Sequence, residues 1–309
     1  SNTILPVITS IILSYICGNV SVCQLSRLNK GIIKKFIDGI PSNCNNYVHY
    51  INLDHNVPSD ENILKELLVQ VPWNVINVWG GEEANNFYFQ NVAKNLNRPK
   101  IINMEPLTGI VIIQRSYLKN NLNRVSKELS TSISEMGQQL CSSPTEGFII
   151  DDTDDYQIDD SFFKKLVDHL EENYIEFTDF ESSYFKLDRM LTYAQDKNSK
   201  VYNSKKYGNK ISIIVSNKKS VFSDSDDSNY LSIHERRNFL ELINTSNFES
   251  LLELIRKINS KSTHKEIKKI QTILVFGNKE FNTEILKLAK NIGAYRVIDA
   301  NYIFKRHPL

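Results

Sequence analysis

The chain has 309 residues, with 37 Lys and Arg against 36 Asp and Glu, so its formal net charge is +1. A content of 41% hydrophobic and 24% charged residues is typical of a globular protein and excludes collagen, a disulfide scaffold and wholesale disorder. The balanced charge argues against binding nucleic acid by bulk electrostatics, so nucleic acid is not an expected partner.

The cysteines and the longest apolar stretch indicate the compartment. No CxxC pair occurs, which disfavours a zinc site or a disulfide framework and suits a reducing compartment. The stretch from Ile4 to Gly18 is interrupted by polar residues and is too short to cross a membrane. We therefore expect a cytoplasmic or nuclear protein without a membrane span. Its four cysteines are Cys17, Cys23, Cys44 and Cys141.

Residues 4–40 predict three short helices, at about 6–16, 21–28 and 29–37, because apolar residues recur there at helical spacing. Helices this short cannot enclose a core of their own. The first is apolar around most of its circumference, so it needs burial on more than one side. A partner protein would supply that burial, and an ordinary helical cap over an α/β core is the alternative.

This segment resembles an F-box, a short helical motif. The resemblance rests on Leu5-Pro6, on Ile12-Leu13-Ser14-Tyr15-Ile16 and on Leu25-Ser26-Arg27-Leu28-Asn29-Lys30. The acidic residue that usually follows Leu-Pro is absent, because Val7-Ile8 stands there. The resemblance implies that residues 1–42 bind a Skp-family adaptor protein. The implied adaptor-binding residues are Leu5, Pro6, Ile8, Ile12, Leu13, Ile16, Leu25 and Leu28.

From Tyr50 onward, strand-like segments alternate with amphipathic helices. The first strands, at 50–54, 75–79 and 101–105, are spaced as in leucine-rich repeats. Residues 106–140 are predicted as mainly helical, and 238–258 as helical with a strand that cannot be placed. Further strands are predicted at 148–151, 174–177, 211–215, 272–276 and 296–299. Helices are predicted at 60–71, 84–96, 161–172, 184–194 and 282–291.

Two architectures produce such a pattern, a leucine-rich-repeat solenoid and a doubly wound α/β sheet. The Ile-Asn-Leu alternation of the first strands favours the solenoid, because parallel strands covered on both faces are continuously apolar. The predicted fold class is thus α/β: a short N-terminal helical F-box, residues 1–42, followed by an irregular leucine-rich-repeat (βα) solenoid, residues 43–309. The solenoid carries acidic and basic inserted loops. The acidic run 151–160 is expected to be a solvated loop, with a cation or basic-partner site as the alternative.

No catalytic pattern emerges. The six histidines are scattered, and neither Cys44 nor Cys141 has a nearby His-plus-Asn pattern that would mark a nucleophile. Gly80-Gly81 follows a predicted strand but lacks the third glycine of a dinucleotide site. We therefore expect a non-catalytic protein with no metal and no cofactor.

In a solenoid, the polar residues of the strands line the concave face and capture a partner. Trp79 is the most informative of these residues, since an exposed Trp among polar neighbours is a candidate hot spot. The expected partner-binding residues are Tyr50, Asn52, Asp54, Asn77, Trp79, Asn103, Glu105 and Glu176.

The resemblance implies a substrate receptor of a cullin-RING (SCF-type) ubiquitin ligase. A second hypothesis keeps the Skp-family adaptor but drops the ligase, so that the complex sequesters or assembles a partner, as a Rab-type small GTPase inhibitor or a kinetochore factor does. A third hypothesis is an α/β enzyme with a helical cap, which predicts a pocket at the carboxyl ends of the strands.

Overall fold

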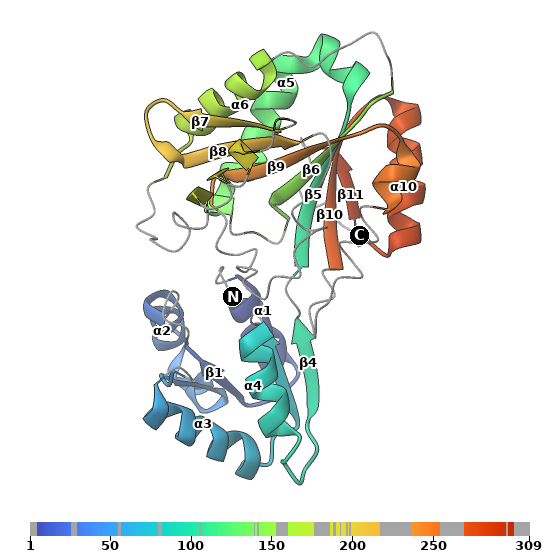
Figure 1. Cartoon of the computed structure of the whole chain (residues 1–309). Coiled ribbons are helices and arrows are strands. Elements are labelled where there is room, and N and C mark those ends of the chain that lie inside the picture. The colour runs from blue at the N-terminus through green and yellow to red at the C-terminus, as the bar shows by residue number, and fades with distance from the viewer. Residues whose placement is uncertain are drawn as a thin grey trace. The chain divides into compact units, whose positions relative to one another are not determined.

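The structure is a computed structural model in which the chain divides into two compact units, Ser1–Glu105 (unit 1) and Pro106–Leu309 (unit 2) (Figure 1). The domain boundary predicted from the sequence lies after residue 42 instead. The structure describes residues 5–25, 30–54, 57–79, 82–104, 107–138, 140, 142–152, 160–175, 186–187, 190–191, 193–195, 197, 199–216, 237–253, 269–294 and 296–299.

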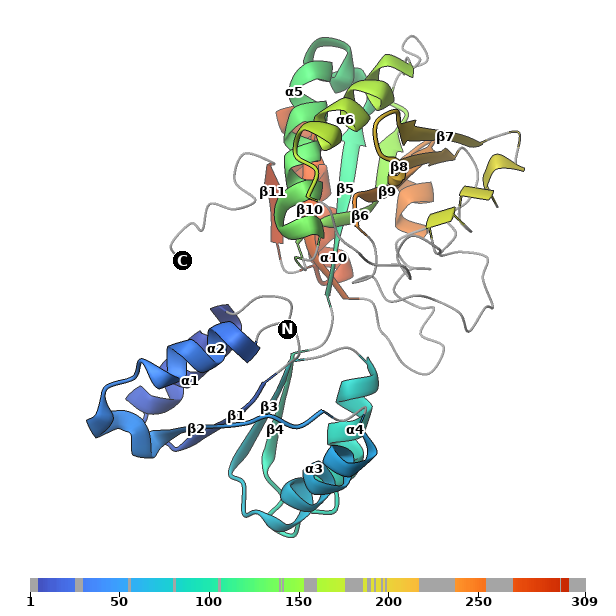
Figure 2. The ribbon, with the colours of Figure 1, turned by 90° about the vertical axis from the view of Figure 1, so that its left-hand side faces the viewer.

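Unit 1 is built from strand–helix–strand segments. Its elements are α1 (Leu5–Ile16), β1 (Ser21–Gln24), α2 (Lys30–Asp38), η1 (Ser42–Tyr47), β2 (Val48–Ile51), α3 (Pro58–Gln70), β3 (Val75–Trp79), α4 (Glu82–Val92) and β4 (Lys100–Met104). Strands β1 and β2 pair in parallel, as do β3 and β4. Figure 2 shows α1 and α2 on one side of these strands and α3 and α4 on the other.

Local chemistry accounts for the ends of α3. Pro58 stands at the first helical position, where its missing N–H costs nothing, and Asp60 and Glu61 suit the positive end of the helix dipole. At the other end, the buried side chain of Asn95 donates from Nδ2 to the carbonyl oxygens of Leu68 and Val71, each at 2.8 Å. These bonds satisfy carbonyl groups that the helix end leaves open.

The first part of unit 1 corrects the three-helix prediction. The first and third helices exist as α1 and α2, but Ser21–Gln24 is a strand, in register with β2 from Ser21↔Val48 to Gln24↔Ile51. The prediction of a second helix over 21–28 is therefore wrong for its first half, and residues 26–29 lie outside the described part of the chain. Strand pairing overrides the helical spacing of Val22 and Leu25.

Unit 2 is organised around one seven-stranded sheet. Its strands are β5 (Leu107–Gln114), β6 (Pro144–Ile150), β7 (Ser199–Ser204), β8 (Gly208–Ser216), β9 (Phe239–Thr245), β10 (Lys269–Phe276) and β11 (Arg296–Asp299). The order across the sheet is β11-β10-β5-β6-β9-β8-β7, and every neighbouring pair is parallel except β7 with β8. Such a sheet is typical of doubly wound α/β proteins.

Helices cover both faces of this sheet. On one face, α5 (Arg115–Ser134) and α6 (Asp160–Glu172) pack on Val111, Ile113 and neighbouring strand residues. On the other face, α10 (Lys279–Ile292) packs on Ile110, Ile112 and Phe148. Figure 2 shows α10 behind the sheet when α5 and α6 are in front. The central strands are therefore apolar at successive positions, as burial on both faces requires.

This topology overturns the predicted solenoid. A solenoid pairs each strand with its neighbours in sequence, whereas β5 lies between β10 and β6. The predicted helical stretch 106–140 begins in fact with β5, and the strand that could not be placed within 238–258 is β9. Tyr174 and Ile175, expected in a strand, lie outside any strand. The predictions for β3, β4, β6, β8, β10, β11 and for α3, α4, α6 and α10 are confirmed as elements.

Candidate active site

A tight turn lies at the amino edge of the unit 2 sheet, just before β6. The backbone N–H of Ser143 donates to the carbonyl oxygen of Leu140 at 2.9 Å, and β6 begins at the next residue, Pro144. Cys141 falls inside this turn in the sequence, although it lies outside the described residues, as does Gln139. The turn thus joins η2 (Glu135–Gln138) to a central strand.

The buried side chain of Gln138 fastens the chain just before this turn. Its Nε2 donates to the carbonyl oxygens of Pro144 at 2.8 Å and of Phe239 at 2.6 Å. Its Oε1 accepts from the backbone N–H of Phe239 at 2.9 Å. Because Pro144 begins β6 and Phe239 begins β9, one amide ties two strand starts to the segment that leads to Cys141.

On the side of β5, the turn rests directly on Gly109. A Cβ at this position would lie 2.5 Å from the carbonyl oxygen of Ser142 and 2.7 Å from that of Ser143. Only glycine allows the two backbones to approach so closely. Beside it, the hydroxyls of Thr108 and Thr145 share a hydrogen bond of 3.2 Å, which links β5 to β6.

The turn also holds a polar group without a partner. Ser143 is 1% exposed, and among the described residues its hydroxyl has no hydrogen-bond partner. Buried hydroxyls are normally bonded, because an unsatisfied one costs free energy. A group bound at the turn could satisfy it, so the hydroxyl is a second feature that marks this turn as a binding place.

A second polar cluster lies at the opposite, carboxyl edge, where ligands often bind in open α/β sheets. Asp152 accepts from Gln114 Nε2 at 2.7 Å, from the backbone N–H of Ser116 at 2.9 Å and from the Ser116 hydroxyl. Gln114 Oε1 in turn accepts from the backbone N–H of Asn278 at 2.8 Å. Burial opposes ionisation of Asp152, but these hydrogen bonds outweigh it and lower its pKa.

This carboxyl-edge cluster ties protein groups to one another. Asp152 satisfies the start of α5, and Gln114 connects β5 with the loop after β10. Beside them, Arg115 forms an ion pair of 2.5 Å with Asp151. We interpret the cluster as structural.

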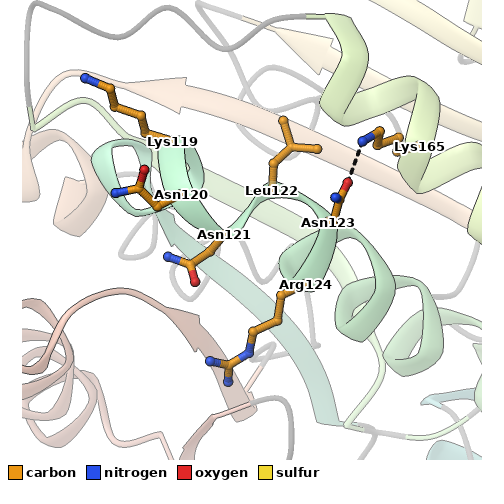
Figure 3. Close-up of a pocket in the computed structure, with 7 residues that line it drawn as sticks. All are labelled: Lys119, Asn120, Asn121, Leu122, Asn123, Arg124 and Lys165. Atoms are coloured by element: carbon orange, nitrogen blue, oxygen red, sulfur yellow. Dashed lines mark hydrogen bonds between the residues drawn. The ribbon is translucent and has the colours of Figure 1, made fainter.

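A cavity of about 380 Å³ lies where α5 is kinked (Figure 3). The kink is at Asn121, whose φ of −127° and ψ of 15° are not helical. Lys165 Nζ donates to Asn123 Oδ1 across the hollow. The lining residues include no thiol, imidazole or carboxylate, so the cavity lacks the groups for acid–base or nucleophilic chemistry. They are Lys119, Asn120, Asn121, Leu122, Asn123, Arg124 and Lys165.

Unit 1 offers features suited to a dinucleotide at the carboxyl ends of β3 and β4. Only Gly80 and Gly81, which lie outside the described residues, separate β3 from α4 in the sequence. A short glycine connection from a strand to a helix N-terminus fits a diphosphate, because no side chain blocks the backbone N–H groups. Asn103, paired with Val78, has a buried Oδ1 without a partner among the described residues. It can accept from a ligand N–H or O–H.

The predicted adaptor-binding residues mostly share α1. Leu5 and Pro6 lie in this helix, their side chains being outside the described set, and Leu28 is outside it altogether. Ile8 is half-buried, whereas Ile12, Leu13 and Ile16 are exposed. Leu25 is buried in the core of unit 1, with Ile11, Ile33, Ile37 and Val48.

The predicted partner-binding residues do not form one concave face. Tyr50 lies in β2, with Asn52 and Asp54 just after it. Asn77 and Trp79 lie in β3 and Asn103 lies in β4, and these two strands form a sheet separate from that of β1 and β2. Asn77 Nδ2 donates to Ser10 Oγ of α1 at 3.3 Å, an internal contact. Glu105 and Glu176 lie outside the described residues.

The described residues contain no group of three or more His, Cys, Asp or Glu side chains that could hold a metal ion. Within the same part of the chain, every helix is too short or too polar to cross a membrane.

No protein-family model matches this chain, and no curated protein matches its sequence. Several solved structures, however, are similar to this chain in fold. A succinic semialdehyde dehydrogenase from Streptococcus pyogenes with NADP+ is similar at TM-score 0.62 and 14% identity, over 92% of this chain and 59% of that one. An aldehyde dehydrogenase from Bartonella henselae is similar at 0.62 and 13%, over 96% and 59%.

A Δ-pyrroline-5-carboxylate dehydrogenase from Mycobacterium tuberculosis bound with NAD is similar at TM-score 0.58 and 12% identity, over 94% of this chain and 53% of that one. The chain therefore has the fold of aldehyde dehydrogenases, and it spans between half and three-fifths of the length of these neighbours.

These comparisons correct the sequence-based hypotheses. The F-box and leucine-rich-repeat identity is wrong, and with it fall the Skp-family partner, the ubiquitin ligase and the sequestering complex. The comparisons also contradict the expectation of a non-catalytic protein, since the neighbours that share the fold are dehydrogenases. The third hypothesis, an α/β enzyme, agrees better with the comparisons.

Sequence reasoning missed the Cys141 turn because it looked for histidine and asparagine partners. The usable signal was the context: two glutamines, Gln138 and Gln139, precede the cysteine, and small polar residues separate it from an apolar strand. Gly109, followed by four β-branched residues, was the corresponding signal for β5.

Proposed function

We propose that the chain is an oxidoreductase domain that acts on an aldehyde, or on the corresponding acyl thioester in the reverse direction, through the thiol of Cys141. The observation that carries the proposal is the held turn at the amino edge of the sheet, with Cys141 inside it, in a fold shared with NAD(P)-linked aldehyde dehydrogenases. Those neighbours are aldehyde-type dehydrogenases with NADP+ or NAD bound, and the proposal extends the aldehyde substrate and the dinucleotide to this chain.

Oxidation of an aldehyde through a covalent adduct requires a nucleophile. A thiolate adds to the carbonyl carbon of an aldehyde, and the carbonyl oxygen becomes an alkoxide. As the alkoxide re-forms the carbonyl, hydride would leave the adduct for a nicotinamide dinucleotide, and a thioester would remain on the sulfur. Water would cleave this thioester to the acid and the free thiol, whereas a second thiol would release it as an acyl thioester, which is the step that starts the reverse direction. Cys141 would form the bond to carbon, and the unpartnered Ser143 hydroxyl is a donor for the oxygen that carries the developing charge.

The other cysteines are less suited. Burial raises the pKa of Cys23 to about 11, so its thiol stays protonated at neutral pH. Cys44 shares a hydrogen bond of 3.0 Å with the Tyr15 hydroxyl, and Cys17 is exposed at the end of α1. All three belong to unit 1, whereas the large sheet belongs to unit 2.

When bound, a nicotinamide dinucleotide supplies the hydride acceptor or donor. Gly80 and Gly81, before α4, would hold its diphosphate, and Asn103 would accept from one of its N–H or O–H groups.

The test is a turnover assay on the 309-residue chain. Aldehydes of increasing chain length are offered with NAD+ or NADP+, and reduced dinucleotide is followed by its absorbance. Cys141→Ser is expected to lower the rate about a thousandfold or more. Cys44→Ser, a matched change in unit 1, should leave it unaltered. Wild-type turnover that survives in Cys141→Ser would refute the proposal, and so would the absence of turnover with every aldehyde and with acyl thioesters plus reduced dinucleotide.

A further inference from the structure

The Gln138 side chain bonds to the start of β9 in the way that a residue of a neighbouring strand would. The paired register of β6 and β9 begins only at Glu146↔Glu241, two residues beyond the start of each strand. At the start of β9, which pairs with β8 through Ser212↔Phe239, the N–H and C=O of Phe239 bond to the Oε1 and Nε2 of Gln138. A primary amide has the same donor and acceptor as a peptide group, so the side chain extends the ladder by one rung.

The bond set of Gln138 is nearly complete. Its two amide hydrogens have acceptors on Phe239 and Pro144, and its oxygen has a donor on Phe239. Its side chain is 2% exposed. A fully bonded, buried amide leaves few alternative rotamers, so the backbone at residue 138 is held at a defined place.

Backbone conformation on both sides of this bridge is unusual. Gln138 has φ of +64° and Asn238, next to Phe239, has φ of +51°. Residues with side chains rarely adopt the left-handed region, and they stay there where the surrounding structure enforces it. The Gln138 amide is the contact that joins these two positions, which is a reason for both to be kept.

Gly109 restrains the same turn from the side of β5. The atoms nearest to a Cβ there would be backbone atoms of Ser142 and Ser143, which cannot move aside as a flexible side chain would. The turn of residues 140–143 is therefore held before Cys141 by Gln138 and after it by Gly109. Neither residue has an ionisable or nucleophilic group that would take part in the chemistry itself.

We propose that Gln138 is a positioning residue: its amide bridge to Phe239 and Pro144 sets the orientation of the turn that carries the Cys141 thiol. This inference rests on the proposed function, in which that thiol is the nucleophile. It adds a role for a residue that does not itself contact substrate.

The central test replaces Gln138 by Leu, which keeps the bulk and removes all three hydrogen bonds. Gln114→Leu is the matched control, because Gln114 is also a buried, multiply bonded glutamine of the same sheet, but at the carboxyl edge. Alkylation of each cysteine by iodoacetamide is followed by mass spectrometry over a pH series. Thermal unfolding of both variants identifies any general loss of stability.

In Gln138→Leu, the pH profile of Cys141 alkylation should differ from that of wild type, because the turn that carries the thiol is no longer held. In Gln114→Leu it should match wild type, and the profile of Cys44 should be unchanged in both. With an aldehyde substrate, kcat of Gln138→Leu should fall about ten- to a hundredfold with little change in KM, because the thiol is misplaced by a small distance. Gly109→Ala, which displaces the turn from the other side, should produce the same pattern.

Identical Cys141 profiles in wild type and Gln138→Leu would overturn the inference, and so would an equal change in Gln114→Leu. If Gln138→Leu does not fold, Gln138→Glu serves instead: it keeps one oxygen for the Phe239 N–H but sets the other against two carbonyl oxygens. Its Cys141 profile should then differ from that of wild type, because the carboxylate repels the carbonyl oxygens of Pro144 and Phe239 at any pH at which a thiol is alkylated. Alkylation needs no turnover, so these outcomes are separate from a failure of the proposed function, which Cys141→Ser decides.

Discussion

The two units build parallel strands from different kinds of sequence. In unit 2, all seven residues of β6 are buried, because helices cover both faces of the sheet. In unit 1, β3 alternates between exposed and partly buried positions, and only Val78 is buried. The difference teaches that the Ile-Asn-Val type of alternation marks a strand in a small, partly open layer. It does not by itself mark a solenoid.

The largest expected effect is a cavity in the core of unit 2. Phe148→Ala empties a fully buried site between β6 and α10 and should lower the free energy of unfolding of unit 2 by about 3–5 kcal/mol. Urea unfolding, followed by hydrogen exchange of the β5 and β6 amides, measures it. Leu286→Ala, on the exposed side of α10, is the control and should change stability by less than about 0.5 kcal/mol. If Phe148→Ala lowers the free energy of unfolding by as little as the control does, the Phe148 side chain is not buried between the sheet and α10.

A medium effect is expected at the carboxyl edge. The folded pKa of Asp152 is lowered, so its ionised form stabilises the protein above its unfolded pKa of about 3.9, and this contribution disappears as pH falls through the lower folded pKa. Asp152→Asn should cost about 1 kcal/mol at pH 7, a value reduced by the exposure of this side chain.

The pH dependence separates this effect from a general one. The difference between wild type and Asp152→Asn should shrink below about pH 4, as measured by urea unfolding at several pH values. Asp168→Asn, an exposed aspartate change on α6, should show no such difference. A gap that stays constant down to pH 2 would show that the carboxylate charge is not responsible.

The smallest effect is expected on α1 of unit 1. Leu13 is 57% exposed, so Leu13→Ser should change the free energy of unfolding by less than about 0.5 kcal/mol. Ile11→Ser, two residues earlier and buried against α2 and β2, should cost several times more. Equal costs for the two changes, measured by thermal unfolding, would mean that Leu13 is buried in solution.

Much of the secondary structure could be predicted from the sequence, because amphipathic helices such as α6 and α10 carry their own periodicity. β5 could not be distinguished from a buried helical segment, since residues 110–113 are apolar without a period. Ser21–Gln24 was misassigned for the opposite reason: its helical spacing is real, but pairing with β2 decides its conformation.

The order of the strands in the sheet could not be predicted from the sequence. Nothing local to β5 indicates that it pairs with β10, more than a hundred and fifty residues later, as Gly109 and Thr272 do. The candidate site could not be predicted for the same reason, because the contact between Gln138 and Phe239 joins residues that are 101 positions apart in the sequence. Partners of this kind come together only in the complete fold, so the sequence pattern around Cys141 could show a cysteine but not its setting.

That span of 101 residues also has a consequence in time. A ribosome that adds about 5–20 residues per second needs roughly 5–20 s to pass from Gln138 to Phe239. Throughout that interval the amide can bond to Pro144 but not to Phe239, so the chain before Cys141 is only partly held. The setting of Cys141 would therefore be completed well after the helix α5 and the strand β6 that flank it have been made.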